Sequence, residues 1–556
     1  MSPVSSPLFL GLDLSTQQIK AVLISQDAVI THESSVRFSE DLPHYSTTNG
    51  AYYGPDKGEV TSPVAMWLEA MDLLMQRMKD TGVDFSRIAA VSGSGQQHGS
   101  VYWSHESDAM LDGLDPAEPL LQLCPHAFSK QRCPIWQDSS TTRECRELEH
   151  AVGGPQALAD LTGSRGYERF TGTQIKRIRR IAPDIYNASA HISLVSSFMP
   201  SLFLGKIAPI EIADASGMNL MNIMTSKWND VLLDAAGGSE LRAKVGPEPV
   251  LGGTHLGTVH CYWVKRWGFS PECIVAPFTG DNPATVVALS APGDALLSLG
   301  TSTTYLLSIP PASTPPKCFT TSHLLAHPTT PGAHIAMLCY KNGALAREQV
   351  RDRFCHASWT AFNQYLESAP PGNNGYSGLY FPIEEIIPPN VLGEFLFKAD
   401  PKDLNALPER TDAIPHTAHP RAIVESQFLS ILSRVAAILP SGAAPLQRLV
   451  ITGGASANET IRRACADMFG LPTYMCATKE AAAMGGALLA KFAWWRAQNG
   501  GGTYEEMSGG ELPGMTCVAE PKVPRETYEA LLPRYRLCEE EVVRVGTLEG
   551  GGLPTN

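Results

Sequence analysis

The hydrophobic positions of the chain fall into short runs separated by polar turns that are rich in glycine and proline. Residues 8–14 and 20–25 are two such runs, and together they predict a hairpin of buried strands. Residues 296–299 and 305–308 repeat this pattern and predict a second hairpin of the same kind. Further strands are predicted at residues 88–92, 274–277 and 448–452.

Between these runs, apolar residues recur at helical spacing, so predicted strands and helices alternate along the chain. The predicted helices cover residues 62–79, 141–148, 174–180, 284–289, 359–366, 421–439, 458–469, 479–490 and 525–543. Residues 309–333 and 400–420 are rich in proline or lack a clear period, and we predict that they are irregular.

Length and composition limit the class of protein. A chain of 556 residues is too long for one ordinary hydrophobic core, so two domains are expected. With 43% hydrophobic and 18% charged residues, the chain is typical of a globular enzyme rather than a disordered protein. The net charge of -13 and the lack of a lysine- or arginine-rich tract argue against nucleic acid as a partner.

Nothing in the pattern predicts a membrane protein or a secreted one. Residues 1–7 lead into the first strand without the charged start and apolar stretch of a signal peptide, and no apolar run approaches the ~18 residues of a membrane helix. The 12 cysteines are scattered and include no Cys-x-x-Cys pair, so neither a zinc site nor a disulfide framework is expected. Free thiols in a reducing cytosol are the simpler interpretation, which predicts a cytoplasmic location.

The turn of the first hairpin carries candidate phosphate-binding chemistry. Ser15, Thr16 and Gln17 would point hydroxyl and backbone N–H groups at one spot, which suits phosphate oxygens. Asp13, at the end of the first strand, would face those phosphates with a cation between them, and Mg²⁺ fits such a place. The alternative is an ordinary hairpin with an exposed aspartate.

The second hairpin has a similar turn of small residues, Gly300, Thr301, Ser302 and Thr303. Two such hairpins, one in each half of the chain, could bind a polyphosphate between their turns. The chain contains no Gly-x-x-x-x-Gly-Lys-Ser/Thr motif, so the P-loop route to ATP binding is absent.

Two stretches carry groups that suit a sugar. In the stretch 93–99, glycines would let the backbone approach a ligand, while Gln97 and His98 offer donors and acceptors to hydroxyl groups. This stretch does not fit a dinucleotide fingerprint, because a histidine takes the place of the third glycine. Trp136 could pack on the C–H face of a sugar, and Asp138 could bind hydroxyls or cap a helix. A lone histidine is more often structural, so that interpretation of His98 stays open.

Asp281 is the candidate catalytic carboxylate. It follows the strand predicted at residues 274–277. The chain would leave the sheet at Thr279 and Gly280, so that Asp281 projects into a cleft. The alternative is that Asp281 simply caps the helix that follows Pro283, for which aspartate is well suited.

A third turn of small residues follows the strand at residues 448–452. Its adjacent glycines, Gly453 and Gly454, would let adenine or ribose lie against the backbone, or would simply make a tight turn into a helix. Residues 214–218 also indicate a turn, and their residue types assign no role to Asp214.

Taken in order, these motifs resemble the FGGY family of carbohydrate kinases, which belongs to the actin, Hsp70 and hexokinase superfamily. The resemblance covers roughly residues 8–495, and it rests on the ordered set because each motif alone is weak. The stretches 94–99 and 169–172 favour xylulose over glycerol as the acceptor. The segment 174–178 lacks the Lys-x-x-Trp pattern of many bacterial members, which weakens the transfer of substrate contacts from them.

The resemblance implies an α/β fold with two ribonuclease-H-like domains around a central cleft. The implied divisions are an N-terminal domain at residues 1–290, a C-terminal domain at 291–500 and an extension at 501–556. The implied reaction is ATP-dependent phosphorylation of the terminal 5-hydroxyl of D-xylulose by a monomer or homodimer. A kinase of ribulose, gluconate or glycerol is the nearest alternative, and an ATP-driven binding protein like actin or Hsp70 is a more distant one.

The resemblance also implies roles for particular residues. His98, Arg169, Asp281 and Asn282 match positions that hold the ketose, with Asp281 as the general base. Asp13 and its hairpin match the first phosphate motif, with Mg²⁺ expected near Asp13 and Asp281. The matches to the second phosphate motif and to the nucleotide site are Gly300, Thr301, Ser302, Thr303, Trp359, Gly454, Ala455 and Asn458.

Overall fold

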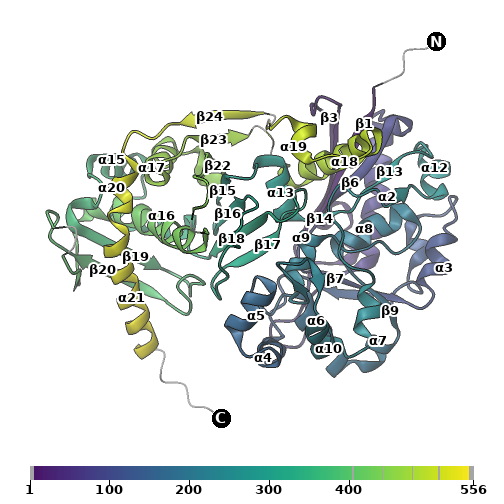
Figure 1. The fold of residues 1–556 in the computed structure, drawn as a ribbon, viewed down its shortest axis with the longest axis horizontal. Coiled ribbons are helices and arrows are strands. Elements are labelled where there is room, and N and C mark those ends of the chain that lie inside the picture. The colour runs from purple at the N-terminus through teal and green to yellow at the C-terminus, as the bar shows by residue number, and fades with distance from the viewer. Residues whose placement is uncertain are drawn as a thin grey trace.

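The computed structural model describes residues 6–403, 406–440, 442–476, 478, 480–510, 512 and 514–549. Residues 1–5, which bear on the signal-peptide argument, and Lys479, the predicted start of a helix, lie outside the described residues. The described chain forms two α/β lobes that lie side by side, each around its own sheet (Figure 1). No helix in these described ranges is both long and apolar enough to cross a membrane.

The first sheet is built around β1 (Leu8–Leu14), which is buried along its whole length. On one side β1 pairs antiparallel with β2 (Gln18–Ile24), and β2 pairs antiparallel with β3 (Ile30–Arg37). On its other side β1 pairs parallel with β6 (Ile88–Gly95), which pairs parallel with β13 (Ile274–Val275). Two short strands, β12 (Gly257–Thr258) and β14 (Thr279–Gly280), extend this sheet.

The second sheet repeats this arrangement. Its central strand β15 (Asp294–Leu299) pairs antiparallel with β16 (Thr303–Ile309), which pairs antiparallel with β18 (His334–Tyr340). On the other side β15 pairs parallel with β22 (Arg448–Thr452), and β22 pairs parallel with β23 (Thr473–Cys476). The same five-strand order in both lobes confirms the α/β fold with two ribonuclease-H-like sheets. The edge strands are β17 (His323–Ala326) and β24 (Met515–Ala519).

The remaining elements surround these sheets. In the first lobe they are α1 (Phe38–Asp41), β4 (Tyr52–Tyr53), β5 (Val60–Pro63), α2 (Val64–Asp80), β7 (Ser100–Ser104), α3 (Ser107–Asp112), β8 (Arg132–Pro134), α4 (Thr142–Ala151), α5 (Pro155–Thr162), α6 (Thr171–Ile181), α7 (Pro183–Asn187), β9 (Ser189–Leu194), α8 (Val195–Leu204), α9 (Ile212–Ala215), β10 (Met221–Asn222), β11 (Lys227–Trp228), α10 (Asp230–Gly237), α11 (Leu241–Val245), α12 (Cys261–Trp267) and α13 (Asp281–Leu289). In the second half of the chain they are α14 (Ala344–Phe354), α15 (Trp359–Ser368), β19 (Tyr376–Phe381), β20 (Gly393–Lys398), β21 (Glu409–Thr411), α16 (His419–Ile438), α17 (Glu459–Phe469), α18 (Ala481–Asn499), α19 (Tyr504–Ser508), α20 (Arg525–Glu529) and α21 (Leu532–Glu549).

Helix α18 comes late in the chain but packs on the first sheet, against β1, β6 and α13 (Figure 1). Small residues make this approach possible. A Cβ atom on Gly485 would lie 1.9 Å from the carbonyl oxygen of Ala284, and one on Gly486 would lie 2.4 Å from the Cα atom of Gly93. The proposed domain division at residue 290 stays a prediction, and α18 belongs to the second half by sequence but to the first sheet by packing.

Three predictions about local structure were wrong. The segment 309–333 contains strand β17, whose four residues are too few to show a period in sequence but pair with β18. The segment 400–420 contains β21 and the first residues of α16. The single helix predicted at residues 525–543 is two helices, because Pro533 has no N–H to bond the carbonyl of Glu529, the last residue of α20.

Candidate active site

A cavity of about 470 Å³ lies between the two lobes, and both halves of the chain line it. The first half contributes Gln97, His98, Trp136, Arg169, Asp281 and Asn282. The second half contributes Ser302, Thr303, Thr304, Met337, Cys339, Tyr340, Lys341 and Ile386. The structure thus brings the predicted sugar-binding residues together with two residues of the second phosphate turn.

Asp281 stands at the end of strand β14, where it begins helix α13. The cap of this helix is Gly280, so the Asp281 carboxylate does not occupy the N-cap position. Its Oδ1 atom instead accepts hydrogen bonds from the backbone N–H and the side-chain amide of Asn282, at 2.8 and 3.1 Å. The amide of Asn282 also donates to Oε1 of Gln97, at 2.8 Å. The carboxylate thus bonds one backbone N–H of the first helical turn and also lines the cavity, so both interpretations of Asp281 stay open.

Two buried acids lie behind Asp281. The hydroxyl of Thr279, two residues before Asp281, donates to the carboxylate of Glu211 at 2.6 Å. Asp214 accepts from Ser196 at 2.5 Å, and a Cβ atom on Gly280 would lie 2.8 Å from its Oδ1 atom. Neither acid was predicted, because the motif at residues 214–218 carries no recognisable pattern. Glu211 bonds the short strand that precedes Asp281, and the side chains of Gln97 and Asp214 leave no room for a Cβ atom at residue 280.

Burial dominates the electrostatics of this cluster. It raises the pKa of Asp281 to about 7, and the nearby negative charge of Asp13 adds to the effect. Burial also raises the pKa values of Glu211 and Asp214 to about 7. A carboxylate that binds a proton near neutral pH is in the range that general bases use.

His98 is buried and sits in the left-handed region of the backbone, with φ of +68°. Few residues other than glycine adopt this conformation, so the surrounding contacts have to hold it. The Nδ1 atom lies 2.9 Å from the carbonyl oxygen of Gly217, and the ring stacks on Phe170. Because a carbonyl only accepts, Nδ1 carries the proton and Nε2 is a hydrogen-bond acceptor. Burial, and then the charge of Arg169, lower the pKa of His98 to about 3, which keeps the ring neutral.

Arg169 is held by a histidine that sequence reasoning missed. Its guanidinium group lies 3.0 Å from Nε2 of His323, a residue of strand β17 in the second sheet. Arginine only donates, so Nε2 of His323 accepts and its Nδ1 atom donates to Ser164, 2.9 Å away. Burial and the charge of Arg169 lower the pKa of His323 well below its ordinary value. A short apolar run around His323 was the only signal in the sequence.

The first hairpin places Asp13 behind the cavity rather than in its lining. Asp13 is 3% exposed and accepts hydrogen bonds from the hydroxyls of Ser15 and Ser94. The exposed aspartate considered as an alternative is therefore ruled out. Burial raises the pKa of Asp13, while the hydrogen bond from Ser15 and the charge of Lys20 oppose this shift. The backbone N–H of Ser15 closes the turn on the carbonyl of Gln18 at 3.0 Å.

Trp136 lines the cavity, whereas Asp138 is buried in the first lobe. The indole of Trp136 lines the cavity and donates a hydrogen bond to the hydroxyl of Thr16 at 2.8 Å. This bond links a predicted sugar-binding residue to the turn of the first hairpin. Asp138 is buried and accepts from Val60, Ser140 and Gln174, so its carboxylate is occupied by the protein itself. It does not cap the next helix, whose cap is Thr141.

The turn of the second hairpin is held from behind by the loop after β18. The backbone N–H groups of Gly343 and Ala344 donate to the carbonyls of Thr301 and Gly300, at 3.1 and 3.0 Å. Of the four predicted residues of this turn, Ser302 and Thr303 line the cavity, while Gly300 and Thr301 do not.

The predicted nucleotide residues belong to the second half of the chain and lie outside the cavity lining. Gly453 follows β22 with φ of +85°, and a Cβ atom there would lie 2.7 Å from the carbonyl carbon of Leu299. The turn at residues 453–455 is thus next to the second phosphate turn. Asn458 caps helix α17, and its amide donates to Asn363 of α15 at 2.9 Å. Trp359 begins α15, where the guanidinium of Arg351 covers its ring.

The acidic residues fit a magnesium ion that keeps part of its water shell. Among the described residues, no group of three or more histidine, cysteine, aspartate or glutamate side chains could hold a metal by itself. Mg²⁺ is usually held by one or two carboxylates together with waters and substrate phosphates. Asp13 and Asp281 are two such carboxylates, and the charge of Asp13 raises the pKa of Asp281. A cation near both would relieve their repulsion.

The sequence of each lobe matches a known family pattern. Residues 131–288 match the N-terminal domain of the FGGY family of carbohydrate kinases, and residues 295–494 match the C-terminal domain of the same family. The chain belongs to the FGGY family of carbohydrate kinases. This membership confirms the resemblance predicted from the ordered motifs, and it identifies the chain as an ATP-dependent sugar kinase.

Whole-length relatives agree with the FGGY assignment. The chain is 41% identical to the mouse protein named xylulose kinase, over 96% of this chain and 94% of that one. It is also 41% identical to D-xylulose kinase A of Aspergillus niger, over 97% of this chain and 99% of that one.

Solved structures share the fold at low sequence identity. A xylulose kinase from Bifidobacterium adolescentis superposes with a TM-score of 0.71 at 19% identity, covering 95% of this chain and 99% of that one. A gluconate kinase from Lactobacillus acidophilus gives a TM-score of 0.73 at 15% identity, covering 98% of this chain and 100% of that one. Such similarity supports the two-lobed FGGY fold alone.

Proposed function

We propose that this FGGY kinase transfers the terminal phosphoryl group of ATP to the 5-hydroxyl of D-xylulose, giving D-xylulose 5-phosphate. One observation carries the proposal: Asp281, His98 and Arg169 face the same cavity as Ser302 and Thr303 of the second phosphate turn. The two relatives at 41% identity carry xylulose kinase names and cover nearly the whole chain, which supports this choice of acceptor.

Asp281 acts as the general base in this proposal. The 5-hydroxyl oxygen attacks the γ-phosphorus, the bond from that phosphorus to the leaving ADP oxygen breaks, and the hydroxyl proton passes to the Asp281 carboxylate. Asn282 orients this carboxylate through its two bonds to Oδ1. General-base catalysis of this kind is worth ~10²- to ~10⁴-fold in rate.

The other cavity residues hold the sugar. Nε2 of His98 accepts a hydrogen bond from a hydroxyl group, because the proton on Nδ1 is already used by Gly217. Arg169 donates to the carbonyl or to hydroxyl oxygens, and Gln97 fixes Asn282 beside them. Closure of the lobes around the sugar excludes water, which would otherwise compete as the nucleophile.

The nucleotide lies between the two hairpins. Backbone N–H groups and hydroxyls of Ser15, Thr16, Gln17 and of residues 300–303 face the phosphates, and the adenosine lies along Gly453, Gly454, Ala455, Asn458 and Trp359. Asp13 and Asp281 would hold Mg²⁺, which when bound supplies positive charge to the phosphates. No disulfide joins the cysteines that the structure describes, which is consistent with our expectation of a cytoplasmic enzyme.

The test is a coupled assay of ADP release with ATP and a panel of D-xylulose, D-ribulose, gluconate and glycerol. We expect D-xylulose to give the highest kcat/KM. A higher value for another acceptor would replace xylulose but keep the kinase, and the named gluconate kinase among the structural neighbours makes gluconate the second candidate. An ATP-driven binding protein, the more distant alternative, does not agree with membership of a carbohydrate kinase family.

A further inference from the structure

Neither phosphate turn contains a lysine or an arginine, although a nucleotide brings several negative charges to the cavity. The cavity already contains the carboxylate of Asp281, with Asp13 close behind it. Arg169 and Lys341 are the cationic residues among those that line the cavity. Arg169 is bonded to His323 and covers the ring of Tyr167 on the sugar side. Lys341 is therefore left as the cation on the phosphate side.

The position of Lys341 is set by the second hairpin. It directly follows Tyr340, the last residue of β18, and Tyr340 pairs with Thr303 at the end of β16. Two residues later the chain bonds to the turn itself, through Gly343 and the carbonyl of Thr301. The Lys341 side chain is exposed to the cavity, and in the described part of the chain it forms no ion pair with a carboxylate. Lys20, by contrast, is already paired with Glu480.

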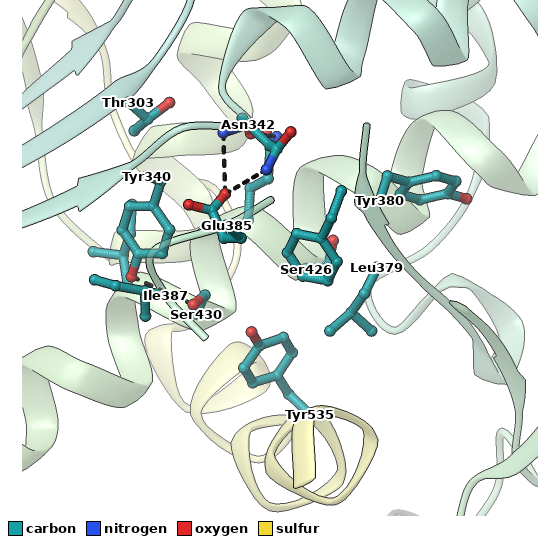
Figure 2. A pocket seen from close by; sticks show the side chains of 13 residues that line it. Thr303, Tyr340, Asn342, Leu379, Tyr380, Glu385, Ile387, Ser426, Ser430 and Tyr535 are labelled. Carbon is teal, nitrogen blue, oxygen red and sulfur yellow. Dashed lines mark hydrogen bonds between the residues drawn. The ribbon is translucent and has the colours of Figure 1, made fainter. Parts of the chain in front are cut away.

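Glu385 holds the backbone of Lys341 in place. Its carboxylate is buried, and it accepts from the backbone N–H of Lys341 at 2.8 Å and from the backbone N–H of Asn342 at 3.0 Å. The side-chain amide of Asn342 donates to the same carboxylate at 2.8 Å, as the dashed lines in Figure 2 show. From the other side, Gln427 donates to the carbonyls of Asn342 and Gly343. The Glu385 carboxylate is thus occupied by backbone N–H groups. It fixes the loop at residues 341–343 and does not neutralise the Lys341 ammonium group.

We propose that Lys341 is a further phosphate-binding residue, whose ammonium group holds the terminal phosphates of the nucleotide against the turn at residues 300–303, with Glu385 as its positioning residue. This inference rests on the proposed function, because it assigns Lys341 to the nucleotide of that reaction. An ammonium group bonded to phosphate makes charge-assisted hydrogen bonds, and phosphoryl transfer depends mainly on such positioning and charge compensation.

Calorimetric titration of the full chain tests the proposal, with a non-hydrolysable ATP analogue, AMP and D-xylulose as separate ligands. Lys341→Gln should weaken binding of the ATP analogue ~10- to ~100-fold, the usual worth of a hydrogen bond to a charged group. Binding of AMP and D-xylulose should change less than about twofold, because neither ligand carries the terminal phosphates. Lys341→Arg should keep most of the affinity. Lys398→Gln, an exposed lysine at the end of β20, is the matched control and should bind as the wild type does.

An unchanged affinity of Lys341→Gln for the ATP analogue would overturn the proposal, and so would a loss confined to D-xylulose. Turnover of D-xylulose by the wild type is measured separately. If the wild type binds the analogue but does not phosphorylate xylulose, the proposed function fails, and the role of Lys341 is still decided by the nucleotide titration. A wild-type chain that binds no nucleotide would refute both.

A double-mutant cycle tests the role of Glu385. Glu385→Gln should weaken binding of the ATP analogue about threefold to tenfold in the wild-type background and much less in the Lys341→Gln background, because the two residues act together. Glu425→Gln, another buried glutamate of this half, is the control and should leave nucleotide binding unchanged. An equal effect of Glu385→Gln in both backgrounds would refute the positioning role.

Discussion

The two hairpins of this protein have the same fold but differ in the charged residues behind their turns. In the first, Asp13 pairs with Lys20 one step before the end of the ladder, and in the second the corresponding pair is Ser298 and Thr304. The first turn is therefore backed by a buried acid. The second turn has no acid and is instead held by the loop that carries Lys341.

This difference teaches how one architecture can serve both ends of a phosphoryl transfer. Small turn residues would let the backbone of both hairpins approach phosphates in the proposed function, so the two turns share their shape. In our proposals, the charged residue behind each turn sets its role: Asp13 would hold a metal ion, and Lys341 would bind the terminal phosphates. Substitutions at four positions test this difference between the hairpins, and we give them in order of decreasing effect.

The largest effect should come from Asp281, which lines the cavity together with Ser302 and Thr303 of the second turn. Asp281→Asn removes the proton acceptor, so kcat should fall ~10²- to ~10⁴-fold. Affinity for the ATP analogue should stay within about threefold, because the amide keeps the shape of the carboxylate. Steady-state kinetics and calorimetry measure the two effects. Near-normal turnover in this variant would rule out the general-base role.

The next effect compares the two turns directly. Asp13→Asn should lower kcat/KM for ATP about 100-fold, since a bound metal ion is worth several kcal/mol of charge stabilisation. Ser298→Ala, at the corresponding step of the second hairpin, should change it by less than about threefold. Raising the Mg²⁺ concentration should recover part of the loss in Asp13→Asn. Equal losses at both positions would mean that the two turns do not divide the charges as we describe.

A smaller effect should come from His323, through which the second sheet holds Arg169. His323→Ala should raise the KM for D-xylulose about tenfold with a smaller change in kcat, because the hydrogen bond that orients Arg169 is lost. His327→Ala removes another buried histidine of the same region and is the matched control. A similar KM in the two variants would show that the effect is a general loss of packing.

The smallest effect concerns the packing behind the second turn. A Cβ atom on Gly343 would lie 2.6 Å from the carbonyl carbon of Ser302, whereas one on Gly454 would meet nothing within 4 Å. Gly343→Ala should therefore lower the free energy of unfolding by ~1–3 kcal/mol in urea titrations, and Gly454→Ala should not. If the two variants were equally stable, the loop would not be packed as tightly against the turn as the contacts indicate.

Much of the site was predictable from sequence because its motifs stand at the ends of strands. Strand β1 and its turn, the stretch at His98 and the stretch at Asp281 are each a buried run followed by small or polar residues. Parallel strands of one sheet bring such ends to the same edge. The family resemblance added Arg169, whose own surroundings in the sequence show no pattern, and the structure places it in the cavity.

Lys341 and His323 were not found in this way. Strand β17 is too short to show a period, and β18, although it is a clear apolar run, was not predicted. A polar residue directly after such a run was the signal that would have pointed to Lys341. Glu211 and Asp214 gave no signal, because their roles depend on Thr279 and Gly280, which are far away in the sequence.

The sequence alone determined the two hairpins, the small residues of their turns and the acid at the mouth of the first lobe, because these depend on local periodicity and residue size. Only the tertiary structure decided which side chains meet across the lobes, since α18 packs against the first sheet and β17 brings His323 to Arg169. Burial then set the protonation of Asp281, His98 and His323, because the loss of water disfavours charge regardless of the neighbours along the chain.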